Sequence, residues 1–209
     1  MAESRHEERL KRAQEEPIVG SLPDVPGIGA AIRLTPGLGI HLRGLADELL
    51  VHDYPGATLS RAEREMIATA VSAGNDCFFC MDSHAAHAAA LIERSGPTTL
   101  LPVLDELKHG SVDGLDSKMR ALVQIASTVR REPRDLSAAD IQRATAAGAT
   151  DSDVQLAVLI AAAFSMYNRM VDGFRARTAP TPDAYLARAD EIADRGYSDP
   201  GAKSGTDQT

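Results

Sequence analysis

The sequence of 209 residues has no tryptophan, few other aromatic residues and only two cysteines. Aromatic residues make up 4% of the chain and apolar residues 44%, so a core must be built mainly from alanine and aliphatic side chains, which favours closely packed helices. The chain also lacks an excess of positive charge. Its net charge of −8 and pI of about 5.2 argue against a protein that binds nucleic acids or acidic membranes.

Signals for secretion and for membrane insertion are also missing. Met1 to Glu16 is charged throughout and has no apolar stretch of the kind found in a secretory signal. The longest apolar run, around Val154 to Met166, is shorter than a membrane span. We therefore expect a cytoplasmic protein, in which a C-x-x-C pair is more often catalytic or metal-binding than a structural disulfide.

Proline and glycine divide the chain into helical segments, and no stretch has the pattern of a strand, so the predicted class is all-α. We expect one domain over 17–197 between a charged N-terminal arm, 1–16, without assigned chemistry and a disordered tail, 198–209. Within the domain, 17–36 is expected to be irregular. The expected helices run from Gly37 to Val51, Ser60 to Gly74, Asp76 to about Arg94, Thr98 to His109, Asp116 to before Pro133, Ser137 to Gly148, Thr150 or Ser152 to Phe174, and Asp183 to Arg195.

Two details of these helices can be compared with a structure. Leu38, Leu42, Leu45, Leu49 and Leu50 form the expected buried stripe of the first helix. Leu59 to Ala70 also lines up with Leu115 to Ala126 at a shift of 56 residues, and each segment precedes a more apolar helix. The sequence therefore predicts a bundle with two related helical hairpins.

The two cysteines, Cys77 and Cys80, form a C-x-x-C motif that His84 and His87 follow. Such a pair is typical of a redox dithiol, of half a metal site or of a small structural disulfide. On a helix the four side chains would share an arc of about 80°. Asp76 is a suitable N-cap, which would place Cys77 in the first turn, where the helix dipole stabilises a thiolate.

A zinc site is the second interpretation of this motif. A structural zinc site has four tetrahedral ligands, and Cys77, Cys80, His84 and His87 supply them by count. One helical face offers poor tetrahedral geometry, however, and no second ligand pair occurs elsewhere in the sequence. We therefore favour the redox pair and expect no bound metal or cofactor.

Glu65 precedes the motif at a distinctive spacing. Glu65, eleven intervening residues and then Cys77-x-x-Cys80-x-x-x-His84 resembles the active-site signature of the alkylhydroperoxidase-D-like (AhpD-like) proteins of the carboxymuconolactone decarboxylase superfamily. The stretch from Leu115 to Gly173 is similar to the peroxidase-related branch of that family, and the resemblance covers roughly residues 32–188. It implies an AhpD-like helical fold that assembles into homo-oligomers, with a trimer or hexamer favoured. We also expect a homo-oligomer because the core of this chain is thin.

The resemblance further implies the activity of a thiol-dependent alkyl hydroperoxide reductase, a peroxiredoxin-type oxidoreductase. In that pattern Cys80 attacks the peroxide and Cys77 resolves the sulfenic acid as a disulfide. Glu65 and His84 form the proton relay, and a dihydrolipoyl group or similar dithiol is the reductant. Some family members have a histidine just before the second cysteine, where this chain has Phe79. The relay is then shorter, uses water or includes His87.

The residues by themselves leave several alternatives open. The helix dipole favours Cys77 as the attacking thiol, whereas a histidine one turn after Cys80 favours Cys80, and we take Cys80. Without its spacing to the motif, Glu65 would be interpreted as a solvated partner of Arg61.

A second class of function also fits the motif. The chain could be a non-peroxidase protein: a redox sensor, a dithiol-disulfide oxidoreductase or a metal-binding regulatory protein. Lactone decarboxylation is disfavoured because it needs no C-x-x-C pair. Asn168, Arg169 and Asp172 are polar residues within an apolar helix, and we expect them to fix the fold or an oligomer interface.

Overall fold

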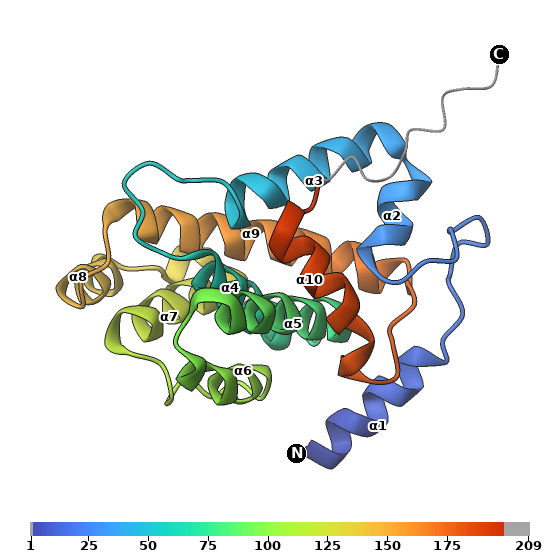
Figure 1. The fold of residues 1–209 in the computed structure, drawn as a ribbon, viewed down its shortest axis with the longest axis horizontal. Coiled ribbons are helices and arrows are strands. Elements are labelled where there is room, and N and C mark those ends of the chain that lie inside the picture. The colour runs from blue at the N-terminus through green and yellow to red at the C-terminus, as the bar shows by residue number, and fades with distance from the viewer. Residues whose placement is uncertain (1, 199–209) are drawn as a thin grey trace.

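The computed structural model describes residues 2–198, with the backbone alone at 2–6 and 95, and over this range the chain is all-α without strands, as predicted (Figure 1). The α-helices are α1 (Ala2–Ala13), α2 (Ile28–Leu34), α3 (Pro36–Leu50), α4 (Arg61–Gly74), α5 (Phe78–Ser95), α6 (Leu101–Lys108), α7 (Ser117–Arg131), α8 (Ala138–Ala146), α9 (Asp151–Gly173) and α10 (Leu186–Arg195). Short 3-10 helices occur at Thr98–Leu100, Pro133–Asp135 and Pro182–Tyr185. Apart from Ser198, the predicted disordered tail lies outside the described residues.

Helices α4, α5, α7 and α9 form the centre of the bundle (Figure 1). α4 packs against α5, α7 and α9, α10 packs across α5, and α6 contacts both α4 and α5. The main core is built from aliphatic side chains and alanine, with Phe164 and Tyr167 as the aromatic residues among its buried members in the described range. This composition agrees with the expectation of close helix packing.

The predicted helix starts are confirmed where a polar residue caps the helix. At α4, the Ser60 hydroxyl accepts a hydrogen bond from the Glu63 N–H (3.3 Å), and the Glu63 carboxylate accepts one from the Ser60 N–H (2.7 Å). Asp116 caps α7 through the N–H of Met119 (2.8 Å). The two capping residues, Ser60 and Asp116, occupy equivalent positions in the internal alignment. That the α4–α5 and α7–α9 pairs are related hairpins stays a prediction.

Two expectations about the first part of the domain are wrong. The segment expected to be irregular contains α2, which buries Ala30, Ala31 and Ile32. A helix of 7 residues is too short to show a clear period in the sequence. On α3, Leu42, Leu49 and Leu50 are buried as predicted, but Leu38 and Leu45 are 48% and 37% exposed instead of lying on the buried stripe.

The charged N-terminal arm has partners that the sequence did not indicate. It forms α1, and both Nε and Nη2 of Arg9 donate to the carboxylate of Asp82 on α5 (3.1 Å each). The guanidinium groups of Arg9 and Arg12 lie 5.2 Å and 5.8 Å from the centre of the Phe78 ring. The arm therefore docks on the helix that carries the C-x-x-C motif.

Helix α9 is long and apolar enough to cross a membrane by length and composition, with a mean hydropathy of 1.4 in its most apolar window. Half of that window is buried inside the bundle, and the helix buries the polar residues Asp153 and Asn168 as well. These are the features of a core helix, as expected from the sequence.

Asp153 connects the start of α9 to the chain that leads into α4. Its buried carboxylate accepts hydrogen bonds from the N–H groups of Thr58 (2.7 Å), Leu59 (3.0 Å) and Thr150 (3.0 Å), and from the Thr58 hydroxyl (2.8 Å). Burial opposes the charge, but these donors outweigh it and lower the pKa of Asp153 to about 2. Since Leu59 is two residues before α4, this contact fixes where α4 begins.

We predict that Asp153→Ala lowers the free energy of unfolding by about 2–4 kcal/mol, because buried donors lose a charged acceptor. The stabilisation by the charge is complete above the unfolded pKa of about 3.9 and is lost as the pH falls towards 2, so the difference from wild type should shrink over that range. Urea unfolding as a function of pH measures both effects. Asp151→Ala, at an exposed position of the same turn, is the matched control and should cost less than about 1 kcal/mol. Equal losses in the two variants would contradict the prediction.

Candidate active site

Helix α5 begins one residue later than expected, so the C-x-x-C motif starts at its N-cap. Asp76 has a φ of +54°, in the left-handed region, and Cys77 is the N-cap residue, so Asp76 is not the cap. The tight turn from α4 holds the Cys77 N–H on the Ser72 carbonyl (3.1 Å). The side chain of Cys77 makes no capping hydrogen bond. The backbone N–H of Cys80 lowers the pKa of the Cys77 thiol, but this effect is smaller than the opposing effects of the Cys80 thiol and of burial. Cys80 lies in the first turn of α5.

Both cysteines are free thiols in a packed apolar cluster, Cys77 with 0% and Cys80 with 2% of its surface exposed. The residues around them are Ala30, Val171, Ala176, Leu22, Val25, Ile28 and Phe79. A hydrogen bond with Cys80, together with burial, raises the pKa of Cys77 well above its ordinary value. Cys77 is therefore held as a thiol beside Cys80, which suits a resolving cysteine more than an attacking one.

Phe79, at the position of the relay histidine of some family members, has a purely apolar environment. Its ring makes an edge-to-face contact with Tyr185 at a centroid distance of 5.4 Å. Gly27 packs against the same ring so closely that a Cβ at Gly27 would collide with it. The residue before the second cysteine therefore cannot take part in proton transfer.

Glu65 and His84 form a buried pair between α4 and α5. The Glu65 side chain is 1% exposed, and its Oε2 accepts a hydrogen bond from Nδ1 of His84 (2.6 Å). Arg61 turns away and donates to the carbonyl groups of Ile192 (3.1 Å) and Ala193 (2.9 Å) at the end of α10. The interpretation of Glu65 as a solvated partner of Arg61 is therefore wrong.

Tyr197 completes this cluster, and the sequence did not identify it. Its hydroxyl donates to Oε1 of Glu65 (2.6 Å), lies 2.9 Å from Nδ1 of His87 and lies 3.3 Å from Nδ1 of His84. Because the hydroxyl donates its hydrogen bond to Glu65, its oxygen is left to accept a hydrogen bond from Nδ1 of His87. A signal was present: an aromatic residue directly after Gly196, the C-cap of α10, is placed to fold back onto the preceding structure.

The charges of the cluster follow from this geometry. Burial would raise the pKa of Glu65, but the two imidazoles outweigh it and lower the pKa to about 2. Burial lowers the pKa of His87, and burial together with Glu65 raises that of Tyr197. Near neutral pH the cluster thus holds one carboxylate, a neutral His87 and an intact phenol. Because His84 donates from Nδ1 to Glu65, Nε2 is the ring nitrogen that this hydrogen bond does not use.

Among the residues that the structure describes, one group brings potential metal-ligand atoms close together. It consists of Glu65, His84 and His87, whose ligand atoms all lie within 4.8 Å of one another. The cysteines do not belong to this group, so the four-ligand set suggested by the sequence is not assembled. The Tyr197 hydroxyl lies within hydrogen-bond distance of an atom from each of the three residues, and thus occupies the middle of the group.

The polar residues of α9 support the turn before Cys77. The Asn168 side chain accepts from Nδ2 of Asn75 (2.8 Å) and donates to the Ser72 hydroxyl (3.1 Å), so it fixes the fold as expected. The Asp172 carboxylate lies 3.5 Å from Nη1 of Arg12. Burial raises the pKa of Asp172, while Arg12 and the nearby Cys77 thiol oppose that rise. These contacts connect the first cysteine to both α9 and α1.

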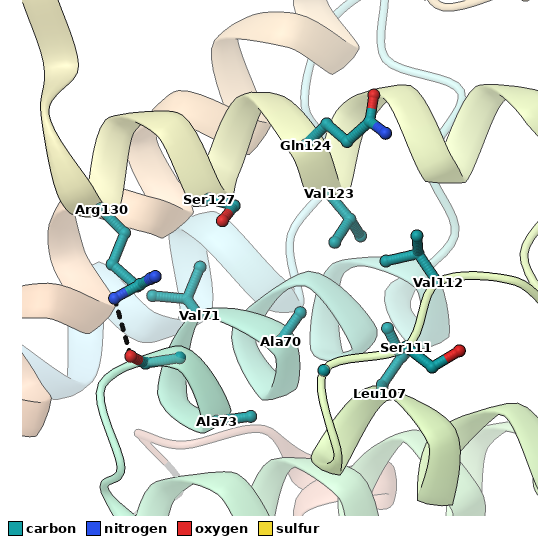
Figure 2. Close-up of a pocket in the computed structure, with 12 residues that line it drawn as sticks. Ala70, Val71, Ala73, Leu107, Ser111, Val112, Val123, Gln124, Ser127 and Arg130 are labelled. Atoms are coloured by element: carbon teal, nitrogen blue, oxygen red, sulfur yellow. Dashed lines mark hydrogen bonds between the residues drawn. The ribbon is translucent and has the colours of Figure 1, made fainter. Parts of the chain in front are cut away.

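A cavity of about 270 Å³ lies between α4, α6 and α7 (Figure 2). Its lining includes Val71, Leu107, Val112 and Val123, and Arg130 closes one end by donating to the Gly74 carbonyl (2.7 Å). Neither cysteine nor any residue of the Glu65 cluster lines this cavity. We therefore place the candidate chemistry at the thiols and the cluster.

Part of the sequence and the fold are similar to known proteins. Residues 44–94, which contain Glu65, both cysteines and both histidines of the motif, match the model of the carboxymuconolactone decarboxylase family. The crystal structure of an alkylhydroperoxidase AhpD core, an uncharacterized peroxidase-related protein from Ralstonia eutropha JMP134, is similar with a TM-score of 0.66 and 25% identity, covering 79% of this chain and 82% of that chain.

A second crystal structure, an uncharacterized peroxidase-related protein from Silicibacter sp. TM1040, has a TM-score of 0.63 and 23% identity, and the match covers 83% of this chain and 93% of that chain. No curated protein has a significant match to the sequence. The resemblance to the AhpD-like proteins of the carboxymuconolactone decarboxylase superfamily, in its peroxidase-related branch, is therefore confirmed.

We predict that the ring signals of His87 titrate, in NMR spectra, with a midpoint below the ordinary value of about 6.5, because burial disfavours the imidazolium. In Glu65→Gln the midpoint should fall further, since the carboxylate that favours the cation is lost. Glu63→Gln is the matched control, because Glu63 bonds to Ser60 instead, and it should leave the midpoint unchanged. A midpoint that rises in Glu65→Gln would contradict this electrostatic description.

Proposed function

We propose that the protein is a thiol-dependent hydroperoxide reductase in which Cys80 attacks the peroxide and Cys77 resolves the intermediate. The observation that carries the proposal is the buried Glu65–His84 pair, with His84 one turn after Cys80 on α5. The raised pKa of Cys77, caused by its hydrogen bond with Cys80 and by burial, supports the same division of roles.

In the first step His84 takes the proton of Cys80, and Glu65 stabilises the imidazolium. The thiolate attacks the terminal oxygen of a hydroperoxide, ROOH, and the O–O bond breaks. Cys80 becomes a sulfenic acid, and the RO⁻ leaving group takes the proton from His84 and departs as the alcohol ROH. Cys80 is thereby oxidised by two electrons and the peroxide is reduced.

In the second step the sulfur of Cys77 attacks the sulfenic sulfur of Cys80. The S–O bond breaks, and the hydroxyl group leaves as water with the proton of the Cys77 thiol, so that an intramolecular disulfide forms. A dithiol, for which we propose a dihydrolipoyl group or a similar reductant, then reduces the disulfide and is released as its own disulfide. Both cysteines return to thiols.

Assembly and location are part of the same proposal. We propose a cytoplasmic homo-oligomer, a trimer or hexamer before a dimer. Apolar side chains that a second copy could cover are exposed on α3 and α9: Leu38, Ile40, Leu159 and Met166.

The same cysteine pair also fits a second function, and access to the two thiols matters for both. With Cys77 and Cys80 0% and 2% exposed, a peroxide reaches them only if the apolar cover moves. A dithiol-disulfide oxidoreductase or a redox sensor would use the same cysteine pair without a peroxide.

We predict that Cys77→Ser reacts once with an organic hydroperoxide and accumulates sulfenic acid on Cys80, because no resolving thiol is left. Cys80→Ser should react no faster than a free thiol. Mass spectrometry with a sulfenic-acid trap distinguishes the two. Sulfenic acid on Cys77 in Cys80→Ser, with Cys77→Ser inert, would reverse the roles. A wild-type protein that reacts with no peroxide but has a reducible disulfide would support the second function.

We predict that Glu65→Gln and His84→Ala slow the oxidation of Cys80 about a hundredfold, because general-base catalysis is lost. Stopped-flow measurement of thiol loss gives the rates, and circular dichroism shows whether the fold is kept. His41→Ala, at an exposed position on α3, is the control and should react like wild type. Folded variants with the wild-type rate would exclude the pair from catalysis.

A further inference from the structure

A short segment after α10 is held so that it brings Tyr197 to the cluster. Gly196 has a φ of +78°, a conformation that favours glycine, and it turns the chain back from the end of α10. The next two N–H groups both donate to the carboxylate of Asp47 on α3, Tyr197 to Oδ1 (2.6 Å) and Ser198 to Oδ2 (2.8 Å). Asp47 is 5% exposed. The buried carboxylate of Asp47 thus binds two consecutive backbone N–H groups, those of Tyr197 and Ser198.

The helix before this segment is fixed to α4, which also carries Glu65. Arg61, the first residue of α4, donates to the carbonyl groups of Ile192 and Ala193, which precede Gly196 by a few residues. The close approach to Asp47 needs glycine, since a Cβ at Gly196 would lie 2.7 Å from Oδ1 of Asp47. Tyr197 is therefore held in a fixed position relative to Glu65.

The Tyr197 hydroxyl determines which atoms of Glu65, His84 and His87 bond to one another. It occupies Oε1 of Glu65, which leaves Oε2 for His84. It also lies next to Nδ1 of His87 (2.9 Å), while that nitrogen is 3.8 Å from Oε2 of Glu65. His87 is therefore nearer to the phenol oxygen than to the carboxylate, and its contact with Glu65 is longer than the 2.6 Å bond of His84.

We propose, building on the function proposed above, that Tyr197 is a positioning residue of the relay: its hydroxyl orients Glu65 towards His84 and keeps His87 away from Glu65. The segment 196–198, attached to Asp47, is then a part of the active site. If the hydroxyl is removed, Oε1 loses its donor in a buried place, and His87 turns to the carboxylate. Glu65 is then shared between two imidazoles, and His84 is held less firmly.

The first experiment is Tyr197→Phe in the Cys77→Ser background. The expected result is a rate of Cys80 sulfenic acid formation with an organic hydroperoxide that is about tenfold or more below the parent, as for a lost hydrogen bond to a charged group. Tyr54→Phe is the matched control, because the Tyr54 hydroxyl bonds to Gln155 at the surface (3.2 Å), and it should react like the parent.

A second readout does not depend on activity. In NMR spectra of Tyr197→Phe, the His87 midpoint should rise, because the ring now contacts the carboxylate directly, and the Nδ1 proton signal of His84 should move. A merely structural role of Tyr197 would not shift a single histidine in this direction. Tyr54→Phe should leave both signals unchanged.

Two variants test the attachment without removing the hydroxyl. Asp47→Ala deletes the acceptor of both N–H groups, and Gly196→Ala pushes the segment away from Asp47. Each should reproduce the slower oxidation and the His87 shift. Combined with Tyr197→Phe, each should add little further loss, since both act through the same hydroxyl.

The outcomes separate this inference from the function on which it rests. If no hydroperoxide oxidises the wild type, the proposed function fails, and the histidine signals still decide whether Tyr197 orients the pair. Wild-type rate and signals in a folded Tyr197→Phe would overturn the inference. So would a loss of rate in Asp47→Ala that Tyr197→Phe does not share. Stoichiometric zinc in the wild type that is lost in His84→Ala would make Tyr197 part of a metal site and also overturn it.

Discussion

The buried negative charge of Glu65 is the constraint on which the rest of the site depends. An ionised carboxylate without access to water costs several kcal/mol unless donors compensate for it. His84 and Tyr197 supply those donors, and His87 lies next to both. Because the donors come from α5 and from the segment after α10, the charge of one residue couples three separate parts of the chain.

The two ends of the motif have opposite environments on the same helix. The thiols of Cys77 and Cys80 lie in an apolar cluster, where burial raises the pKa of Cys77, whereas His84 and His87 lie in a polar, charged cluster. At the N-cap, the backbone N–H of Cys80 lowers the pKa of Cys77, but the Cys80 thiol and burial outweigh it. In the function proposed above, the reactivity of the pair depends on the base that takes a proton from Cys80 more than on the helix dipole.

The helices around the site are held by contacts that also hold the cluster. Asp153 fixes the chain that enters α4, and Arg61 connects the start of α4 to the end of α10. Arg94 of α5 forms ion pairs with Asp190 and Asp194 of α10. These contacts fix α4, α5 and α10 relative to one another. The hydrogen bonds of the cluster join residues from α4, from α5 and from the segment after α10, so they depend on these fixed positions.

The sequence alone determined the helical class and most helix starts, because caps such as Ser60 and Asp116 act within one turn of chain. Spacing likewise identified the cysteines, Glu65 and His84 as candidates. Tertiary structure decided what surrounds them: the turn that leaves Asp76 at positive φ, the partner of Arg61, and the arrival of Tyr197 at Glu65 across 132 residues of sequence. Such contacts form only when distant helices pack. A local sequence pattern therefore cannot predict which side chains packing brings together.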